Sequence, residues 1–157
     1  MATGKVNPIP DLFRGVTPAL CMPQAAKAME FYKKAFGATE LVKFVDPSSG
    51  KVAHAEMKIG EHALFIVSDV HPGFNHSPEE FGGTTVNLYV YVPDVDRFIE
   101  RAVAAGAKLV MPVKTQFYGD RSGRIEDPFG YVWIFATHVE DVPEEELHKR
   151  MKQQGGA

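Results

Sequence analysis

Two stretches of the chain show the hydrophobic spacing of amphipathic helices. The first, Gln24–Phe36, stops at Gly37, and the second follows Asp94, a suitable N-cap residue, and stops at Gly106. A short apolar strand pattern precedes each helix, and strand patterns follow it. The predicted buried positions are Ala25, Ala28, Met29, Tyr32, Ala35 and Phe36 in the first helix and Val95, Phe98, Ile99, Ala102 and Val103 in the second.

Alternating and apolar runs predict the strands. Thr84–Val92 alternates so that Asn87, Tyr89 and Tyr91 share one face. The segment Tyr118–His138 predicts a β-hairpin, because its Asp-Pro-Phe-Gly sequence has the chemistry of a tight turn. A shorter hairpin pairs Lys51–Ile59 with His62–Asp69, and the remaining predicted strands are Gly15–Met22, Thr39–Val45 and Lys108–Val113.

The same order of elements occurs twice. Gly106 follows Gly37 by 69 residues, and Gly130 follows Gly60 by 70 residues. Two separate landmarks with almost the same offset indicate a duplicated unit. We therefore expect two βαβββ modules within residues 14–142, in an α+β fold. The predicted boundaries are an N-terminal arm 1–13, module one 14–69, a linker 70–83, module two 84–142, and a C-terminal helix and tail 143–157.

Composition narrows the class of partner. The 157-residue chain is 45% hydrophobic, carries a net charge of -3 and contains no block of basic residues, which argues against nucleic acid or an anionic membrane as its partner. Its single cysteine cannot form an intramolecular disulfide. We see no signal peptide and no membrane-spanning run, so the cytoplasm is the expected compartment.

Two motifs carry a family resemblance. The helix end Ala28–Ala38 reads A-x-E-F-Y-x-x-x-F-G-A, and Asp127–His138 reads D-P-F-G-x-x-W-x-x-A-T-H. Together with the paired modules, they resemble the vicinal oxygen chelate superfamily, which includes glyoxalase I, bleomycin-resistance proteins and extradiol dioxygenases. The His-Ala-Glu of residues 54–56 and the Tyr-Gly-Asp-Arg of residues 118–121 are most similar to the PhnB-like subgroup.

The resemblance implies curved mixed sheets around a cavity and a homodimer. In metal-dependent members of the superfamily, the modules together hold a divalent metal. The corresponding positions here are Thr17, Leu64 or Ile66, Asn87 and Ile134, none of which is a His, Asp, Glu or Cys. Transition metals do not select such groups. We therefore expect no metal and no other cofactor at the usual site.

A substitute site is conceivable on the first hairpin. His54 and Glu56 share a strand face, and His62 lies on the paired strand. Such a cluster could bind zinc or act as acid and base, with His54 and Glu56 as candidate catalytic residues. The alternative is an ordinary surface or lining contact. In the second module the corresponding pair is Arg124 and Glu126.

The second hairpin offers arginines and aromatic residues. Arg121 and Arg124 could hold a carboxylate or phosphate, or could form an ion-pair network with Asp120. Trp133 could line the cavity, which we favour, or pack against a helix, because strand alternation does not show which face meets the cavity. The expected ligand-binding residues are Phe44, Phe65, Asn87, Tyr89, Tyr91, Tyr118, Arg121 and Trp133, and Phe117 could join the aromatic wall.

These observations favour metal-independent binding of a small organic molecule, as in antibiotic sequestration or metabolite carriage. The alternative is a lyase- or dioxygenase-like enzyme with a non-standard site around His54 and Glu56. Whether the protein is an enzyme stays open from the sequence.

Overall fold

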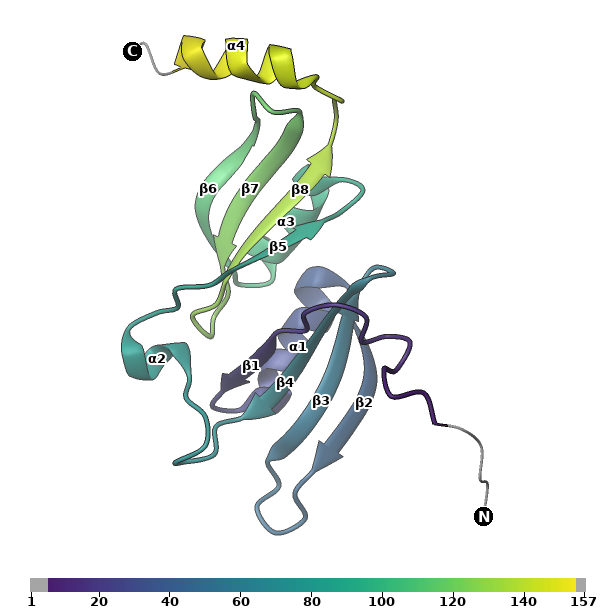
Figure 1. Ribbon diagram of the computed structural model, residues 1–157. Helices are drawn as coiled ribbons and strands as arrows, with labels where there is room; N and C mark the ends of the chain where they lie inside the picture. The colour runs from purple at the N-terminus through teal and green to yellow at the C-terminus, as the bar shows by residue number, and fades with distance from the viewer. Residues whose placement is uncertain (1–5, 155–157) are drawn as a thin grey trace.

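A computed structural model of the chain describes residues 6–154. Residues 1–5 of the predicted arm and residues 155–157 of the predicted tail lie outside the described residues. The described chain folds into two four-stranded mixed sheets with helices, an α+β architecture (Figure 1). The predicted fold class is confirmed.

The two sheets have the same topology. The first has the order β1-β4-β3-β2 and the second has the order β5-β8-β7-β6; in each, the first strand pairs in parallel with the last and the other pairs are antiparallel. The first module consists of β1 (Ala19–Met22), α1 (Ala25–Phe36), β2 (Thr39–Val45), β3 (Val52–Ile59) and β4 (Ala63–Asp69). The second consists of β5 (Asn87–Tyr91), α3 (Val95–Ala104), β6 (Lys108–Thr115), β7 (Asp120–Glu126) and β8 (Val132–His138).

The glycine landmarks occupy equivalent places in the two modules. Gly60 lies between the third and fourth strands of the first module, and Gly130 lies at the same point of the second, both with positive φ. Gly37 and Gly106 each follow the module's long helix. The duplication predicted from their spacing is therefore confirmed in the topology.

Two strands begin later than predicted. β1 starts at Ala19 rather than Gly15, because Pro18 has no N–H to donate and contributes only its carbonyl, which accepts from the backbone N–H of Ile66. β5 starts at Asn87 rather than Thr84, because the Thr84 hydroxyl accepts a hydrogen bond from the N–H of Val86 and forms a local turn.

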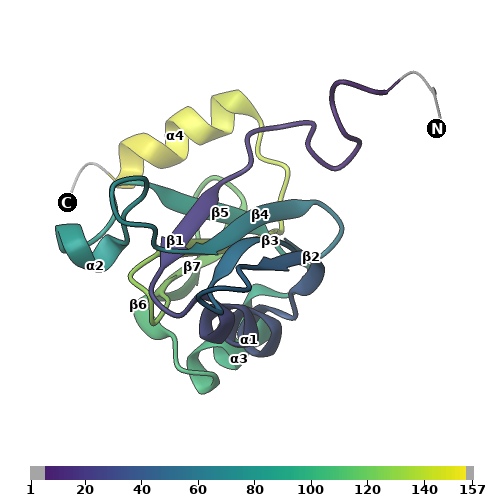
Figure 2. The ribbon, with the colours of Figure 1, turned by 90° about the horizontal axis from the view of Figure 1, so that it is seen from below.

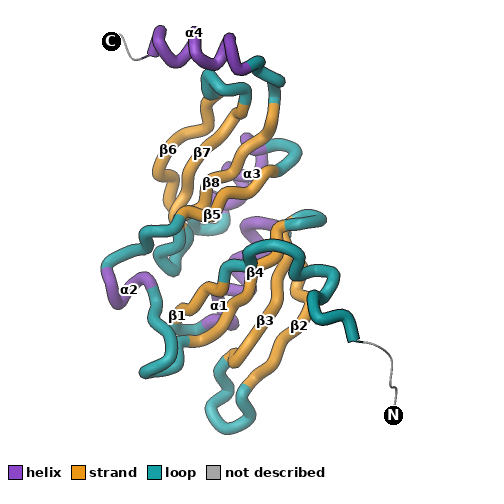
Figure 3. Tube along the Cα trace, viewed as in Figure 1, coloured by secondary structure: helices purple, strands orange, loops and turns teal. Residues whose placement is uncertain are grey.

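Two further helices lie outside the modules. One of them, α2 (Pro78–Phe81), lies within the connecting segment (Figure 3). It begins with a capping box in which Ser77 and Glu80 satisfy each other's backbone groups. The predicted helix after Pro143 is present as α4 (Glu144–Gln154), with three acidic residues in its first turn. No helix among residues 6–154 is both long and apolar enough to cross a membrane.

Helices α1 and α3 lie together on one side of the sheets, and α4 lies on the other (Figure 2). Between α1 and the second sheet, Phe36 meets Trp133 with ring centroids 5.0 Å apart and Phe135 with centroids 5.1 Å apart. The aromatic core thus joins the modules into one unit.

Candidate functional site

Each sheet has one covered face and one open face. We call the side turned away from α1 and α3 the open face. Trp133 is 2% exposed and Phe65 is 2% exposed, and their rings contact each other in the core beneath α1. This corrects the prediction that these two residues form an open aromatic wall, because strand alternation gave their shared face correctly but not its direction. Both border only a small hollow of about 190 Å³ between the two modules.

The open face instead carries the residues that alternate with the buried ones along each strand. In the second module these include Asn87, Tyr89 and Tyr91 on β5, opposite Val132, Ile134 and Ala136 on β8. In the first module, Phe44 on β2 is opposite His54 on β3 and is 61% exposed.

Arg121 is not part of this face. It points to the helix side, where its Nε and NH2 atoms donate to both carboxylate oxygens of Asp96 at 2.6 and 2.7 Å. The predicted anion-binding role of Arg121 is therefore corrected, because its fork of donors is already occupied by α3. The alternative network of Asp120, Arg121 and Arg124 is also absent among the described residues, since each of the three has a different partner.

A buried carboxylate organises the open face of the second module. Asp120 accepts hydrogen bonds at Oδ2 from the hydroxyls of Tyr91, at 2.6 Å, and Tyr89, at 3.4 Å. Its Oδ1 lies 2.8 Å from Nδ1 of His138, directly across the β7–β8 pair. We call Tyr89, Tyr91, Asp120 and His138 the tyrosine platform.

The electrostatics of the platform follow from this network. Burial alone would raise the pKa of Asp120, but hydrogen bonds from Tyr91 and His138 outweigh it and lower that pKa. The hydrogen bonds from His138 to Asp120 and Asp141 raise the pKa of the imidazole. Burial raises the pKa of Tyr89, and the nearby Tyr118 hydroxyl adds to the rise. The tyrosines therefore stay protonated at neutral pH.

Beside the platform lies Arg124. Its NH2 donates to Oδ1 of Asn87 at 3.0 Å, reaching across β8 from β7 to β5. Its Nε is buried and has no hydrogen-bond partner among the described residues. A donor left without a partner in this way is uncommon in folded proteins.

The open face of the first module contains the His54–Glu56 pair. His54 Nε2 lies 3.2 Å from Glu56 Oε1, and their side chains are 37% and 18% exposed. His62 does not join them, which corrects the predicted three-residue cluster: it lies in the β3–β4 turn, whereas Glu56 is paired with Ile66 further along β4. His62 precedes Ile66 by four residues, so it lies about 13 Å along the strand from the position opposite Glu56.

The residues expected at the usual metal position of the superfamily offer poor donor atoms. Ile66, Asn87 and Ile134 lie on the open faces, where they offer hydrocarbon and one amide. Within residues 6–154, no group of three or more His, Cys, Asp or Glu side chains is placed to hold a metal ion. This donor set does not suit a divalent metal.

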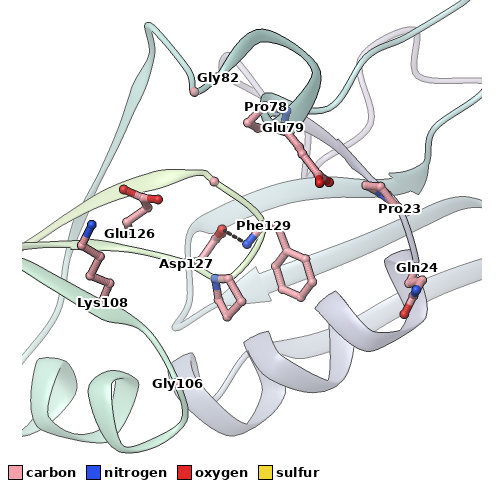
Figure 4. A pocket seen from close by; sticks show the side chains of 13 residues that line it. Pro23, Gln24, Pro78, Glu79, Gly82, Gly106, Lys108, Glu126, Asp127 and Phe129 are labelled. Atoms are coloured by element: carbon pink, nitrogen blue, oxygen red, sulfur yellow. Dashed lines mark hydrogen bonds between the residues drawn. The ribbon is translucent and has the colours of Figure 1, made fainter.

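Several hollows lie where the two modules meet, and two of them are much larger than the hollow beside Trp133. One, of about 640 Å³, is formed by the start of α1, α2 and the β7–β8 turn, with Phe129 projecting between Asp127 and Gln24 (Figure 4). Its buried polar group, Asp127, is fully used by protein donors. The other, of about 830 Å³, runs along the outer edge of β5 and is lined by Tyr89, Tyr91 and the β3–β4 turn. This second cleft extends the tyrosine platform.

Comparison with known proteins identifies the family. The model of the Glyoxalase/Bleomycin resistance protein/Dioxygenase superfamily matches residues 16–135. The chain belongs to this superfamily. Its topology of two βαβββ modules is consistent with that membership.

Relatives within the superfamily span most of the chain. An uncharacterised protein of Mycobacterium tuberculosis is 37% identical over 143 residues, which cover 89% of this chain and 84% of the relative. The solved structure of an Arabidopsis thaliana gene product is 32% identical with a TM-score of 0.59, covering 79% of this chain and 98% of that one. The structure of TioX from Micromonospora sp. ML1 is 25% identical with a TM-score of 0.62, covering 82% of this chain and 99% of that one.

Sequence reasoning did not place two members of the platform among the binding residues. Asp120 was considered only as an ion-pair partner of the arginines. His138 was noted only as the end of a family motif, although it completes the tyrosine platform. Counting the register of the second hairpin outward from its turn pairs Asp120 with His138, so the signal was present in the sequence.

Phe117 and Tyr118 lie in the β6–β7 turn at the end of the sheet, with Tyr118 39% exposed.

Proposed function

We propose that this superfamily member binds a flat organic molecule on the tyrosine platform without a metal ion. The observation that carries the proposal is the state of the two tyrosine rings. Tyr89 and Tyr91 are 45% and 59% exposed, yet both hydroxyls are hydrogen-bonded to the buried Asp120. Aromatic rings in such a setting offer their faces to a stacked ligand.

The tethering of these hydroxyls favours binding. A free surface tyrosine loses rotational freedom when a ligand stacks on it, whereas Tyr91 is already held by a bond of 2.6 Å. Less entropy is then lost on binding. The two rings are also neighbours, with centroids 5.4 Å apart and planes 46° apart, so one ligand can contact both.

The proposal includes a homodimer. The described chain leaves part of each open face exposed, with Phe44 61% and Tyr91 59% exposed. Ligand sites usually bury most of the ligand surface, and a bare sheet covers only one side of it. A second copy placed over the open faces would supply the other side. Analytical ultracentrifugation that shows only monomer at micromolar concentration would oppose this part.

The subgroup assignment is also proposed. The Tyr-Gly-Asp-Arg motif is the basis for the PhnB-like subgroup. In this motif, Asp120 accepts hydrogen bonds within the platform, and Arg121 bonds β7 to Asp96 of α3. The motif thus has a structural role beside the proposed site. This supports the assignment of the chain to the PhnB-like subgroup.

The test uses purified protein and pairs of aromatic acids and their amides: benzoate with benzamide, cinnamate with cinnamamide, and 1-naphthoate with 1-naphthamide. Thermal shift and calorimetry should show stabilisation that rises with ligand concentration. Tyr91→Ala should weaken binding by about 5- to 150-fold, the worth of one stacked ring. Phe74→Ala is the matched control, since Phe74 is 86% exposed on the linker. Absence of binding by the whole panel, or equal affinity in both variants, would overturn the proposal.

A second function is favoured by the His54–Glu56 contact of 3.2 Å, which suits a base oriented by a carboxylate. Under this alternative, the protein is a lyase- or dioxygenase-like enzyme that transforms the ligand. Mass spectrometry after incubation with any panel member that binds would detect the product. Glu56→Gln should abolish its formation while affinity is kept; unchanged ligand would remove this alternative.

A further inference from the structure

We infer that the ligand is an anion, an aromatic or conjugated carboxylate whose negative group lies at Arg124 and whose ring lies on Tyr89. This inference rests on the proposed function, since it names the chemical class that the same face would accept. Three observations carry it: the unmatched charge of Arg124, its place beside the tyrosine ring, and the charges that surround it.

Arg124 differs from the other arginines of residues 6–154. Arg14, Arg97, Arg121 and Arg150 each have a carboxylate within 4 Å. Arg101 lacks one but donates to two backbone carbonyls at the end of α1. Arg124 has only the amide oxygen of Asn87, and its Nε has no partner. A half-buried guanidinium with a neutral acceptor and a spare donor lacks the counter-charge that such groups normally have.

The position of Arg124 fits a ligand that reaches Tyr89. Along the sheet, Arg124 is opposite Ile134, and Ile134 is opposite Tyr89, so all three share the open face. The bonded Asn87 precedes Tyr89 by two residues, about 7 Å along β5. A flat molecule can therefore place an acidic group at the guanidinium and its ring on the tyrosine.

The surrounding charges favour an anion. The chain as a whole has a net charge of -3, but this face carries Lys108 opposite Glu126 and Lys114 opposite Ser122, in addition to Arg124. The remaining carboxylate, Asp120, is engaged with two tyrosine hydroxyls and His138. Carboxylates are the natural partners of guanidinium, because two parallel N–H···O bonds match their geometry.

The experiment compares each acid of the panel with its amide, which has the same shape and no charge. Wild-type protein should bind the acids about 10- to 100-fold more tightly, the worth of a charge-assisted hydrogen bond. Arg124→Gln should remove this preference, and Arg124→Lys should restore part of it. Arg97→Gln is the matched control, because Arg97 is an 87% exposed arginine on α3, away from the open face.

Equal binding of acids and amides, or an acid preference that persists in Arg124→Gln, would overturn the inference while leaving the proposed function in place. Binding by no member of the panel would overturn the proposed function itself. If Arg124→Gln weakens dimer formation and leaves the acid preference unchanged, Arg124 serves the subunit contact and the inference is wrong. Circular dichroism of each variant establishes that it is folded before binding is compared.

Discussion

The hydroxyl of Tyr32 donates a 2.8 Å hydrogen bond to Oδ2 of Asp127, joining α1 of the first module to the β7–β8 turn of the second across 95 residues. The same carboxylate accepts from Trp133 Nε1 and from the backbone N–H groups of Phe129 and Tyr131. Burial raises the pKa of Asp127, and the donated bonds oppose that rise. One side chain thus shapes the turn and fastens the two modules together.

Replacement of this carboxylate should destabilise the whole domain. In the native protein, each carboxylate oxygen of Asp127 accepts from two donors. In Asp127→Asn, an NH2 group replaces one of these oxygens, so two donors would lose their acceptor. We expect a loss of free energy of unfolding on the order of 3 kcal/mol, measured by urea denaturation. Tyr32→Phe should cost about 1–3 kcal/mol, since it removes a single bond to the charged group. Glu100→Gln, on the exposed side of α3, is the control; a stability of Asp127→Asn equal to that control would contradict the prediction.

Trp133 should report on the core rather than on the ligand. Trp133→Ala should lower the free energy of unfolding by about 3–5 kcal/mol, as large-to-small core replacements do. Because this is the chain's single tryptophan, its fluorescence should have the emission of a buried indole in the native protein and shift to the red on unfolding. Two results together would contradict this prediction and show that Trp133 lines the ligand site: tryptophan emission that changes when ligand binds, and a Trp133→Ala variant with unchanged stability.

Tyr131 should protect the edge of β1. Its hydroxyl accepts from the backbone N–H of Cys21 at 2.8 Å and donates to the carbonyl of the same residue at 2.8 Å. β1 pairs with β4 on its other side only, so Tyr131 takes the place of a neighbouring strand. We expect Tyr131→Phe to cost about 1–3 kcal/mol and to accelerate hydrogen exchange at the Cys21 amide. Unaltered exchange at that amide would show that the bond is absent in solution.

His138 should make stability depend on pH. Its pKa is raised by hydrogen bonds to Asp120 and Asp141, so it binds its proton more tightly when folded. This contribution is fully present below the unfolded histidine pKa of about 6.5 and is lost as pH rises through the folded pKa. Measurement of the ring titration by NMR should give a midpoint above that unfolded value. His138→Gln should flatten the fall in stability over this window, and an identical pH profile in the variant would refute the assignment.

Asp120 should make stability depend on pH in the opposite direction, with stability lost as pH falls. Its folded pKa is lowered, so its contribution is present above the unfolded aspartate value of about 3.9 and is lost as pH falls through the folded pKa. Tyr91→Phe removes the shortest bond to this carboxylate and should move its pKa upward. Carboxyl titration by NMR measures that shift, and no shift in Tyr91→Phe would mean that the hydroxyl does not stabilise the charge.

The topology could be predicted from local signals in the sequence. Helical spacing ending at Gly37 and Gly106, and turns at Gly60 and Gly130, are local signals, because each depends on residues close together in the chain. Their repetition predicted the duplicated module. The strand alternation likewise determined that Asn87, Tyr89 and Tyr91 share a face.

The covered face of each sheet, in contrast, depends on long-range packing. A strand alternates identically whichever side a helix packs on, and α1 comes from the other module to cover Trp133, so no local pattern could place that ring. The partners of the charged residues were equally undetermined. Arg121 and Arg124 lie three positions apart on the same strand, yet one meets Asp96 of α3 and the other reaches Asn87 of β5, because adjacent elements in space, and not neighbours in sequence, supply the acceptors.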